Sequence, residues 1–354
     1  MPALRNDTDL MSRSPIFFER NRVFRVYKGG KLFHDFFGDD AVDGNHPEEW
    51  IASSVKALNK DSTDPMEGLS IVRGTGLPFA SLMRDSAQEM TRGKPFDVLV
   101  KVLDSAVRLP AQAHPDKAFS RKHFKSEHGK TEMWLVLATR PGANIYFGFK
   151  EGTTKEQLDQ AVKNGESDPA AFTNVLQEFP ASAGDVWLIP ARAAHAIGAG
   201  CLILEVQEPT DFTIQPERWC DTYRLSEQEM YLGLEPKTAM EVFDLSLAGR
   251  KAAEHWKKKP TAIENGSGYL KEALITYTDT PCFAVNRHTL QAGSECSING
   301  PAVFVVTDGE GSLQSGTGAH PCKKGDYFFL PQAAGKVKAS TGSKLQLAEC
   351  LPPK

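Results

Sequence analysis

The sequence lacks any hydrophobic run long enough to cross a membrane, because no stretch of about 18 apolar residues occurs in it. It also lacks an excess of positive charge. Forty-one Lys and Arg residues stand against 45 Asp and Glu residues, which gives a formal net charge of −4 over 354 residues. This balance excludes a strongly basic nucleic-acid-binding protein. We therefore expect neither a membrane nor a nucleic acid as a partner.

Cysteine is scarce and scattered. Six cysteines occur, at positions 201, 220, 282, 296, 322 and 350, and no two of them form a CxxC pair. In a chain of this length the pattern is typical of reduced, buried thiols rather than of a disulfide framework. The first 15 residues are polar and lack the apolar centre of a signal peptide. Together these features predict a cytoplasmic globular protein.

Two common catalytic signatures are missing as well. The sequence contains neither a GxSxG nucleophile motif nor a GxxxxGK[ST] phosphate-binding loop. We therefore expect neither serine-based nucleophilic catalysis nor nucleotide binding by a P-loop.

Short β-like runs dominate what is present. They span 96–104, 132–139, 185–191 and 201–207 in the first part of the chain, and 302–308, 326–331 and 344–350 in the second. Clusters of Gly, Pro, Asp and Ser between them are typical of a β sandwich or barrel. Two stretches have helical spacing instead: 153–179, which opens with a Thr cap, and 226–258, where Ser226 and Glu229 have the spacing of a capping box.

An internal repeat connects the two parts. GDVWLIPARAAH at 184–195 and GDYFFLPQAAGK at 325–336 share a Gly-Asp start, an apolar strand and a proline at the seventh position. Two copies of one β unit favour two related barrels with helical insertions. The alternative is a chance match of a common strand-to-turn pattern.

Histidine distinguishes the two copies, because His195 stands where the second copy has Lys336. Upstream, Gln112 and His114 lie two residues apart, so on a strand both side chains point to one face. Glu132 opens the next strand. Two imidazoles, a carboxylate and an amide suit a divalent metal such as zinc, with an open position for substrate. By spacing alone, the alternative is a set of ordinary core and surface residues.

The resemblance to a known family rests on five segments. PFDVLVKVLDS, AQAHPDK, GKTEMW, GDVWLIP and HAIGAG, in this order, resemble type I mannose-6-phosphate isomerases, which are zinc-dependent enzymes of the cupin superfamily. The likeness extends over nearly the whole chain. It implies a mainly β fold of two cupin (jelly-roll) barrels with helical insertions. The N-terminal metal-binding domain would span 1–220, with its helical insertion at about 153–179. A helical segment would follow at 221–262, and a C-terminal cupin domain without metal ligands would span 263–354.

The resemblance also implies the site. One zinc ion per chain would be held by the residues that spacing had nominated: Gln112, His114, Glu132 and His195. Lys130 matches a family lysine close to the reacting sugar, and we expect burial and a nearby cation to lower its pKa so that it can shuttle protons. Asp211 matches the family aspartate and is the second acid–base candidate.

Departures from the family pattern concern the substrate. Gln215 stands at the position of the family arginine, and a neutral amide cannot supply the bidentate, charged contact of a guanidinium. Pro110 replaces a serine of the phosphate site. Arg218, which we assign a catalytic role, or Arg192, in the turn before the last ligand, is expected to replace the missing cation. The alternative for Arg192 is a solvent-facing turn residue. Trp50 is predicted to border the sugar pocket, with core packing as its alternative.

These features predict a zinc-dependent aldose–ketose isomerase. The expected reaction interconverts mannose 6-phosphate and fructose 6-phosphate through a cis-enediol, with a small hexose phosphate as partner. The missing serine and arginine keep two alternatives open. One is an isomerase of a different or unphosphorylated hexose, and the other is a non-catalytic sugar-binding paralogue that retains zinc. The sequence leaves the oligomeric state open.

Overall fold

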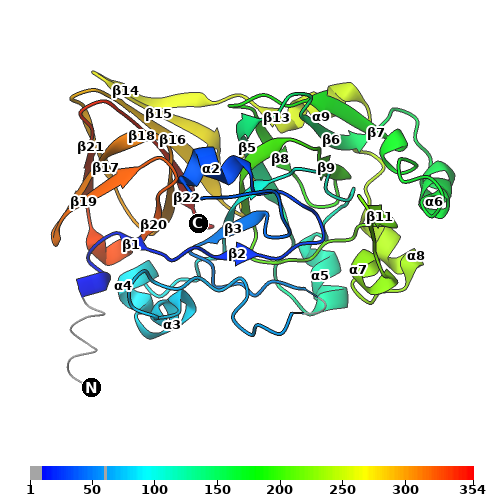
Figure 1. The fold of residues 1–354 in the computed structure, drawn as a ribbon, viewed down its shortest axis with the longest axis horizontal. Coiled ribbons are helices and arrows are strands. Elements are labelled where there is room, and N and C mark those ends of the chain that lie inside the picture. The colour runs from blue at the N-terminus through cyan, green and yellow to red at the C-terminus, as the bar shows by residue number, and fades with distance from the viewer. Residues whose placement is uncertain (1–9, 60–61) are drawn as a thin grey trace.

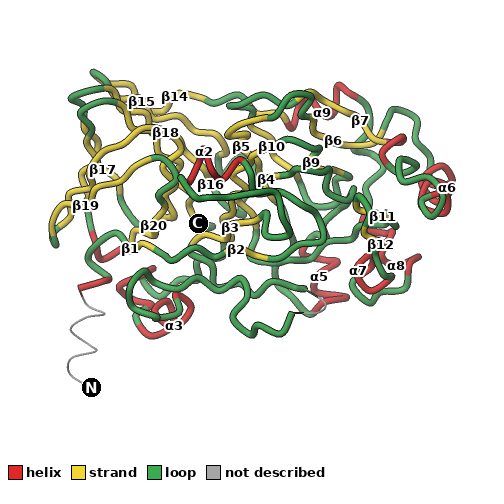
Figure 2. The backbone as a smooth tube through the Cα atoms, in the orientation of Figure 1, coloured by secondary structure: helices red, strands yellow, loops and turns green. Residues whose placement is uncertain are grey.

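The computed structural model describes residues 10–59 and 62–354, in which two β-sheet assemblies lie side by side (Figure 1). Strands dominate both assemblies and short helices lie around them, so the chain is mainly β, as predicted (Figure 2). Most of the polar N-terminal segment discussed above lies outside the described residues. Within the described ranges, no helix has the length and apolarity needed to cross a membrane.

The first sheet contains the strands predicted in the first part of the chain. Its order is β13 (Lys257–Lys258), β8 (Val186–Ile189), β5 (Glu132–Thr139), β10 (Cys201–Gln207), β4 (Leu99–Asp104), β3 (Glu48–Ile51) and β2 (Arg22–Val23). The runs predicted at 132–139 and 201–207 form strands with those bounds. A smaller sheet has the order β7 (Leu176–Pro180), β6 (Asn144–Phe149) and β9 (His195–Ile197).

The second sheet contains the strands predicted in the second part. Its main order is β1 (Ile16–Phe17), β20 (Tyr327–Leu330), β18 (Ala302–Ser315), β22 (Lys344–Leu351), β16 (Ala284–Gln291), β15 (Tyr269–Ile275) and β14 (Thr261–Gly266). Three further strands, β17 (Glu295–Ile298), β19 (Gly318–Lys323) and β21 (Val337–Ser340), pair beside this path. β18 is longer than its predicted run because it continues into a hairpin with β19.

The two sheets share one strand order. In the first sheet the neighbouring strands are β8, β5, β10, β4 and β3, and the corresponding strands of the second sheet are β20, β18, β22, β16 and β15. In the first sheet Ile189, directly before Pro190, pairs with Glu132. In the second sheet Leu330, directly before a proline, pairs with Ala302. The repeated sequence unit therefore occupies equivalent positions in both sheets, which argues against a chance match.

Helices surround the sheets. They are α2 (Leu32–Phe37), α3 (Phe79–Asp85), α4 (Ala87–Thr91), α5 (Lys117–Phe124), α6 (Lys155–Asn164), α7 (Glu227–Tyr231), α8 (Pro236–Ala239) and α9 (Arg250–Trp256), with 3-10 turns η1 (Thr173–Val175), η2 (Met240–Val242) and η3 (Gln332–Ala334). A short hairpin joins β11 (Trp219–Cys220) and β12 (Tyr223–Arg224). The capping box expected at Ser226 and Glu229 is present at the start of α7.

The stretch predicted to be helical at 153–179 is helical only in its first half. Thr154 caps α6, which ends at Asn164, and the chain then turns and forms β7. β7 pairs with β6 and buries Leu176 and Phe179 in the core. Apolar residues three apart favour a helix, and here pairing with β6, with a register shift between Tyr146 and Phe149, overrides that local preference. The stretch 226–258 likewise breaks into α7, α8 and α9.

One apolar cluster joins the two sheets. It contains Val100 and Leu204 from the first sheet, and Val285, Val303 and Phe329 from the second, all buried. Burial of apolar surface at about 25 cal/mol per Å² makes such a shared core a major stabilising contribution. The six cysteines are all buried and unpaired.

Candidate metal centre

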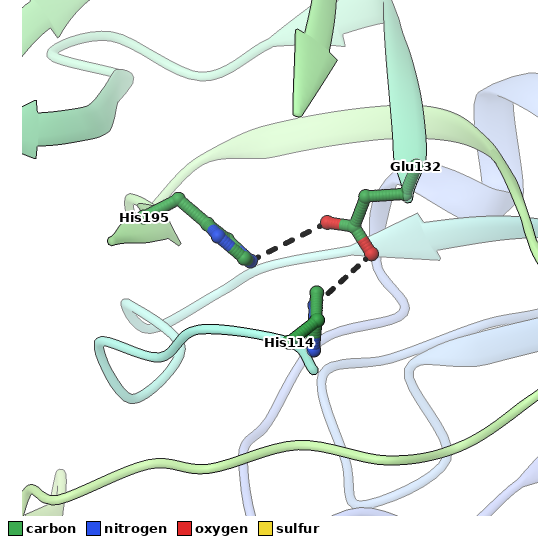
Figure 3. A group of neighbouring side chains, drawn as sticks. All are labelled: His114, Glu132 and His195. Atoms are coloured by element: carbon green, nitrogen blue, oxygen red, sulfur yellow. Dashed lines mark ion pairs between the residues drawn. The ribbon is translucent and has the colours of Figure 1, made fainter. Parts of the chain in front are cut away.

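Three of the predicted ligands converge at one end of the first sheet (Figure 3). Glu132 begins β5, His195 begins β9, and His114 lies on the extended segment between β4 and α5. His114 Nε2 is 3.1 Å from Glu132 Oε2, and His195 Nε2 is 3.4 Å from Glu132 Oε1. Ligand bonds of about 2.0–2.2 Å in a tetrahedral zinc site separate neighbouring ligand atoms by about 3.3 Å. The triad therefore has the spacing of a small divalent cation site.

Backbone pairing brings these segments together. Gln112 and His195 exchange two backbone hydrogen bonds, each with an N–O distance of 2.9 Å. Ala113 pairs in the same way with Ile214, and Arg192 N donates to His114 O at 2.8 Å. The side chain of Gln112, the fourth predicted ligand, lines the cavity beside the triad. The extended segment and the turn before β9 thus hold the ligands in register.

Hydrogen bonds to the far side of each imidazole fix its tautomer. His114 Nδ1 lies 2.9 Å from the carbonyl oxygen of Phe212, and His195 Nδ1 lies 2.9 Å from that of Ala193. A carbonyl oxygen only accepts, so each Nδ1 carries the proton and donates it. Each Nε2 then keeps its lone pair for the side facing Glu132, which is the arrangement that metal-binding histidines use.

Burial and missing partners support a cation at this position. His195 Nε2 and both carboxylate oxygens of Glu132 form no hydrogen bond within the described residues. Buried polar atoms are rarely left in this state without an ion or water. Burial lowers the pKa of His195 to about 3 and also lowers that of His114, so both rings are neutral, as metal ligation requires. The donor set fits a divalent metal.

Lys130 lies directly beside the triad. Its Nζ is 2.9 Å from His114 Nε2 and 3.1 Å from Glu132 Oε2, and the side chain is almost fully buried. Burial alone would raise the pKa of Glu132, but the positive charge of Lys130 holds it well below its usual value. The carboxylate therefore stays ionised, as a metal ligand must.

A cavity of about 970 Å³ opens beside the metal centre. Four of the predicted site residues line it: Gln112, Lys130, Asp211 and Gln215. Pro110 is also on its wall. The volume is ample for a hexose phosphate, since small-molecule sites typically span about 300–1,000 Å³.

Sequence reasoning missed a group of charged residues on the cavity wall. Lys101 of β4 lies 3.3 Å from Glu205 of β10 and 3.7 Å from Glu48 of β3. Burial raises the pKa of Glu205 to about 7, and the nearby Glu132 carboxylate acts in the same direction. The signal was available, because Lys101 and Glu205 interrupt otherwise apolar strand runs and such residues are seldom buried without a role.

Two predicted substrate contacts, Trp50 and Arg192, and one predicted catalytic residue, Arg218, are not among the residues that line the cavity. Trp50 is fully buried in the core beside β4. Arg192 directs its guanidinium away to the carbonyl oxygen of Val242, at 3.3 Å. Arg218 is paired with Glu166, at 3.1 Å. Backbone and acidic partners outside the cavity hold both arginines, so neither lines the space beside the metal centre.

The two remaining predicted residues line the cavity but have partners in the protein. Gln215 Nε2 donates to the carbonyl oxygen of Glu229, at 3.1 Å. Asp211 accepts hydrogen bonds from Nη2 of Arg25, at 3.1 and 3.2 Å, and from the backbone N–H of Leu58, at 2.9 Å. Asp211 therefore lies in an ion pair that the sequence did not suggest.

Several known proteins with sequences similar to this chain are named mannose-6-phosphate isomerase. Residues 273–348 match the family model of the mannose-6-phosphate isomerase cupin domain. Mannose-6-phosphate isomerase ManA of Bacillus subtilis is 30% identical over 249 residues, which cover 70% of this chain and 72% of the relative. The mannose-6-phosphate isomerase of Streptococcus mutans is 27% identical over 323 residues, covering 90% and 92%. The chain belongs to the mannose-6-phosphate isomerase family.

Solved structures show that the family fold extends over the whole chain. The mannose 6-phosphate isomerase from Bacillus subtilis superposes with a TM-score of 0.74 at 22% identity, covering 95% of this chain and 99% of that one. The apo form from Salmonella typhimurium gives a TM-score of 0.67 at 15% identity, covering 96% and 100%. The type I family resemblance seen in the sequence is confirmed, and the chain is an enzyme of the sugar phosphate isomerase class.

Proposed function

We propose that this protein is a metal-dependent isomerase that interconverts mannose 6-phosphate and fructose 6-phosphate. The buried triad of His114, Glu132 and His195, beside a cavity of about 970 Å³, carries the proposal. Relatives named mannose-6-phosphate isomerase support the choice of substrate.

The proposed metal is zinc, one ion per chain, held by the triad together with Gln112. Two neutral imidazoles and oxygen donors favour zinc among the common divalent metals, without excluding other first-row ions. When bound, the ion polarises a sugar carbonyl or hydroxyl group and offsets negative charge on the substrate. His195 Nε2 and Glu132 Oε1, which form no hydrogen bond within the described residues, support this occupancy.

We further propose that the two sheet assemblies are two cupin barrels. Their shared strand order and the cupin-domain match at 273–348 support this division. The proposed domains are those expected from the sequence: a metal-binding domain at 1–220, a helical segment at 221–262 and a second cupin domain at 263–354. The triad belongs wholly to the first of them.

Isomerisation moves a proton between C1 and C2 of the sugar through a cis-enediol, which needs a group that can accept and return it. Lys130, with Nζ 3.1 Å from Glu132 Oε2, is the proposed proton donor at the metal end of the cavity. Glu205 is added as an acid–base group, because a carboxyl with a pKa of about 7 exchanges protons readily at neutral pH. Asp211 faces the same space and remains a candidate, although its ion pair with Arg25 favours a positioning role.

A coupled assay of the zinc-loaded protein tests the proposal, with mannose 6-phosphate beside free mannose. We expect turnover of the phosphate, loss of activity after zinc is chelated, and recovery when zinc is restored. His195→Ala should lose both bound zinc and activity. A protein that contains one zinc per chain and leaves mannose 6-phosphate unchanged would refute the proposed reaction.

A second candidate is an isomerase of an unphosphorylated hexose. It is favoured by Gln215 and Pro110, which line the cavity and stand where the family has an arginine that helps hold the substrate and a serine of the phosphate site. The Gln215 amide is moreover committed to the carbonyl oxygen of Glu229. This candidate predicts a higher kcat/KM for free mannose or another hexose than for mannose 6-phosphate, and a sugar panel in the same assay separates the two. Binding of the sugar phosphate without product would instead indicate a non-catalytic paralogue.

A further inference from the structure

We propose that Arg25 is the cation that recognises the phosphate group of the substrate, in place of the arginine that the family has at position 215. This inference rests on the proposed function and specifies how its substrate is recognised. Neither Arg192 nor Arg218, which the sequence suggested for this role, lines the cavity, whereas Arg25 does.

The surrounding residues hold Arg25 in a fixed orientation. Its Nε donates to Glu48 at 3.0 Å, and its Nη2 donates to both carboxylate oxygens of Asp211. Nη1 donates to Asn59 at 3.1 Å. These bonds engage all three guanidinium nitrogens. Nη1 carries two N–H groups and has one partner within the described residues, so one N–H on it is left over. The guanidinium also lies over the ring of Trp50, 5.3 Å from its centre.

The location of Arg25 relates it to the missing family arginine. Asp211, its ion-pair partner, lies only four residues before Gln215 on the segment that crosses the cavity wall. That segment also supports the metal centre, because the carbonyl oxygen of Phe212 accepts the hydrogen bond of His114 Nδ1. Arg25 therefore lies on the same part of the cavity wall as Gln215. In the chain, Arg25 follows β2, whereas Gln215 follows β10.

The other cations of the wall have different roles. Lys101 and Lys130 pair with Glu205 and Glu132. Arg22 reaches the cavity wall, but its guanidinium is bound by Asp39 and Glu49 and lies 3.9 Å from the ring centre of Phe33. Arg25 is thus the cation that is both fixed on the wall and adjacent to the Gln215 segment.

Arg25 is a charged group on this wall. It is ion-paired with Glu48 and Asp211. Burial alone would lower the pKa of Arg25, but Asp211 and Glu48 raise it, so the guanidinium stays charged. A charged, oriented guanidinium is well suited to a phosphate group.

The experiment uses the full-length, zinc-loaded protein and compares Arg25→Met with Arg25→Met/Gln215→Arg. Binding of sorbitol 6-phosphate, which cannot isomerise, is measured by calorimetry, together with KM and kcat for mannose 6-phosphate. We expect Arg25→Met to weaken binding and raise KM by about 10²-fold, the scale for loss of one partner of a buried charge contact. Gln215→Arg in the same chain should recover about tenfold or more, because it restores a cation on that wall. Arg84→Met removes an exposed arginine of α3 and serves as the matched control.

Zinc content and thermal unfolding of each variant separate a folding defect from a recognition defect. Wild-type affinity for sorbitol 6-phosphate in Arg25→Met would overturn the proposal. A loss that Gln215→Arg does not reverse would also overturn it, because the effect would then come from the unpaired Asp211 and Glu48. An equal loss in Arg192→Ala or Arg218→Ala with none in Arg25→Met would assign the role elsewhere. Failure of the proposed function is distinguishable, since the wild-type protein itself would then not turn over mannose 6-phosphate.

Discussion

The two sheets share a strand order but differ in the chemistry of equivalent positions. Glu132 pairs with Ile189 in the first sheet, and Ala302 pairs with Leu330 in the second. A carboxylate of the proposed metal centre in one sheet is thus a methyl group in the other. The second sheet forms the same strand order without this carboxylate. The strand order therefore does not depend on a metal at this position.

A second pair of positions shows how the surroundings determine the role of a buried carboxylate. Glu205 and Glu349 occupy equivalent places on β10 and β22. Glu349 accepts hydrogen bonds from Asn286 and His288, at 2.7 and 3.2 Å, and pairs with Lys271 at 3.1 Å. These partners outweigh burial and lower its pKa to about 2, whereas the pKa of Glu205 is raised to about 7.

The largest expected effect comes from making the first sheet resemble the second. Glu132→Ala introduces the residue found at the equivalent position, Ala302. We expect loss of bound zinc and a fall in kcat/KM of about 10³-fold or more, the upper scale for removal of an electrostatic stabiliser. Zinc content by elemental analysis and the coupled assay measure both effects. Stoichiometric zinc in this variant would contradict the ligand assignment.

A smaller effect on activity separates the two equivalent carboxylates. Glu205→Gln removes a proposed acid–base group, so kcat should fall by about 10²-fold with zinc retained. Glu349→Gln is the matched change in the second sheet, and its kcat should stay within about twofold of the wild-type value, since the residue lies outside the cavity wall. Equal losses of kcat in both variants would mean that Glu205 is only structural.

The smallest effect is a difference in how stability depends on pH, measured by denaturant unfolding of the metal-free protein. A folded pKa below the ordinary value of about 4.5 means that ionised Glu349 stabilises the fold above pH 4.5, and this contribution is lost as the pH falls towards 2. At neutral pH it is at most about 3 kcal/mol. Glu349→Gln should therefore be less stable than wild type at pH 6 and equal to it near pH 2.

Glu205 should make the stability of the fold depend on pH in the opposite direction. Its raised pKa means that the folded state binds the proton more tightly, so wild-type stability should fall between about pH 4.5 and 7 from this group. Glu205→Gln removes that component, and the variant should gain stability relative to wild type as the pH rises from about 4.5 to 7. If the stability of both variants, relative to wild type, changed with pH in the same direction, the different surroundings assigned to the two carboxylates would be contradicted.

The sequence predicts seven central strands of the two sheets, because buried strands such as β5 and β10 are continuous apolar runs with clear ends. It leaves other strands, such as β3, β15 and β16, unassigned. It fails for β7, whose identity depends on pairing with β6. Residue type, spacing and family resemblance are enough to single out His114, Glu132 and His195, which the structure brings together. Arg25 could not be singled out in this way, because its role depends on contact with Asp211, 186 residues further along the chain.

The most direct test of the account follows mannose 6-phosphate by NMR in one sample with free mannose and the protein, after zinc content is measured. The account predicts that the mannose 6-phosphate signals give way to those of fructose 6-phosphate while mannose stays unchanged, and that the conversion stops when zinc is chelated. Unchanged mannose 6-phosphate in a sample with one zinc per chain would contradict it.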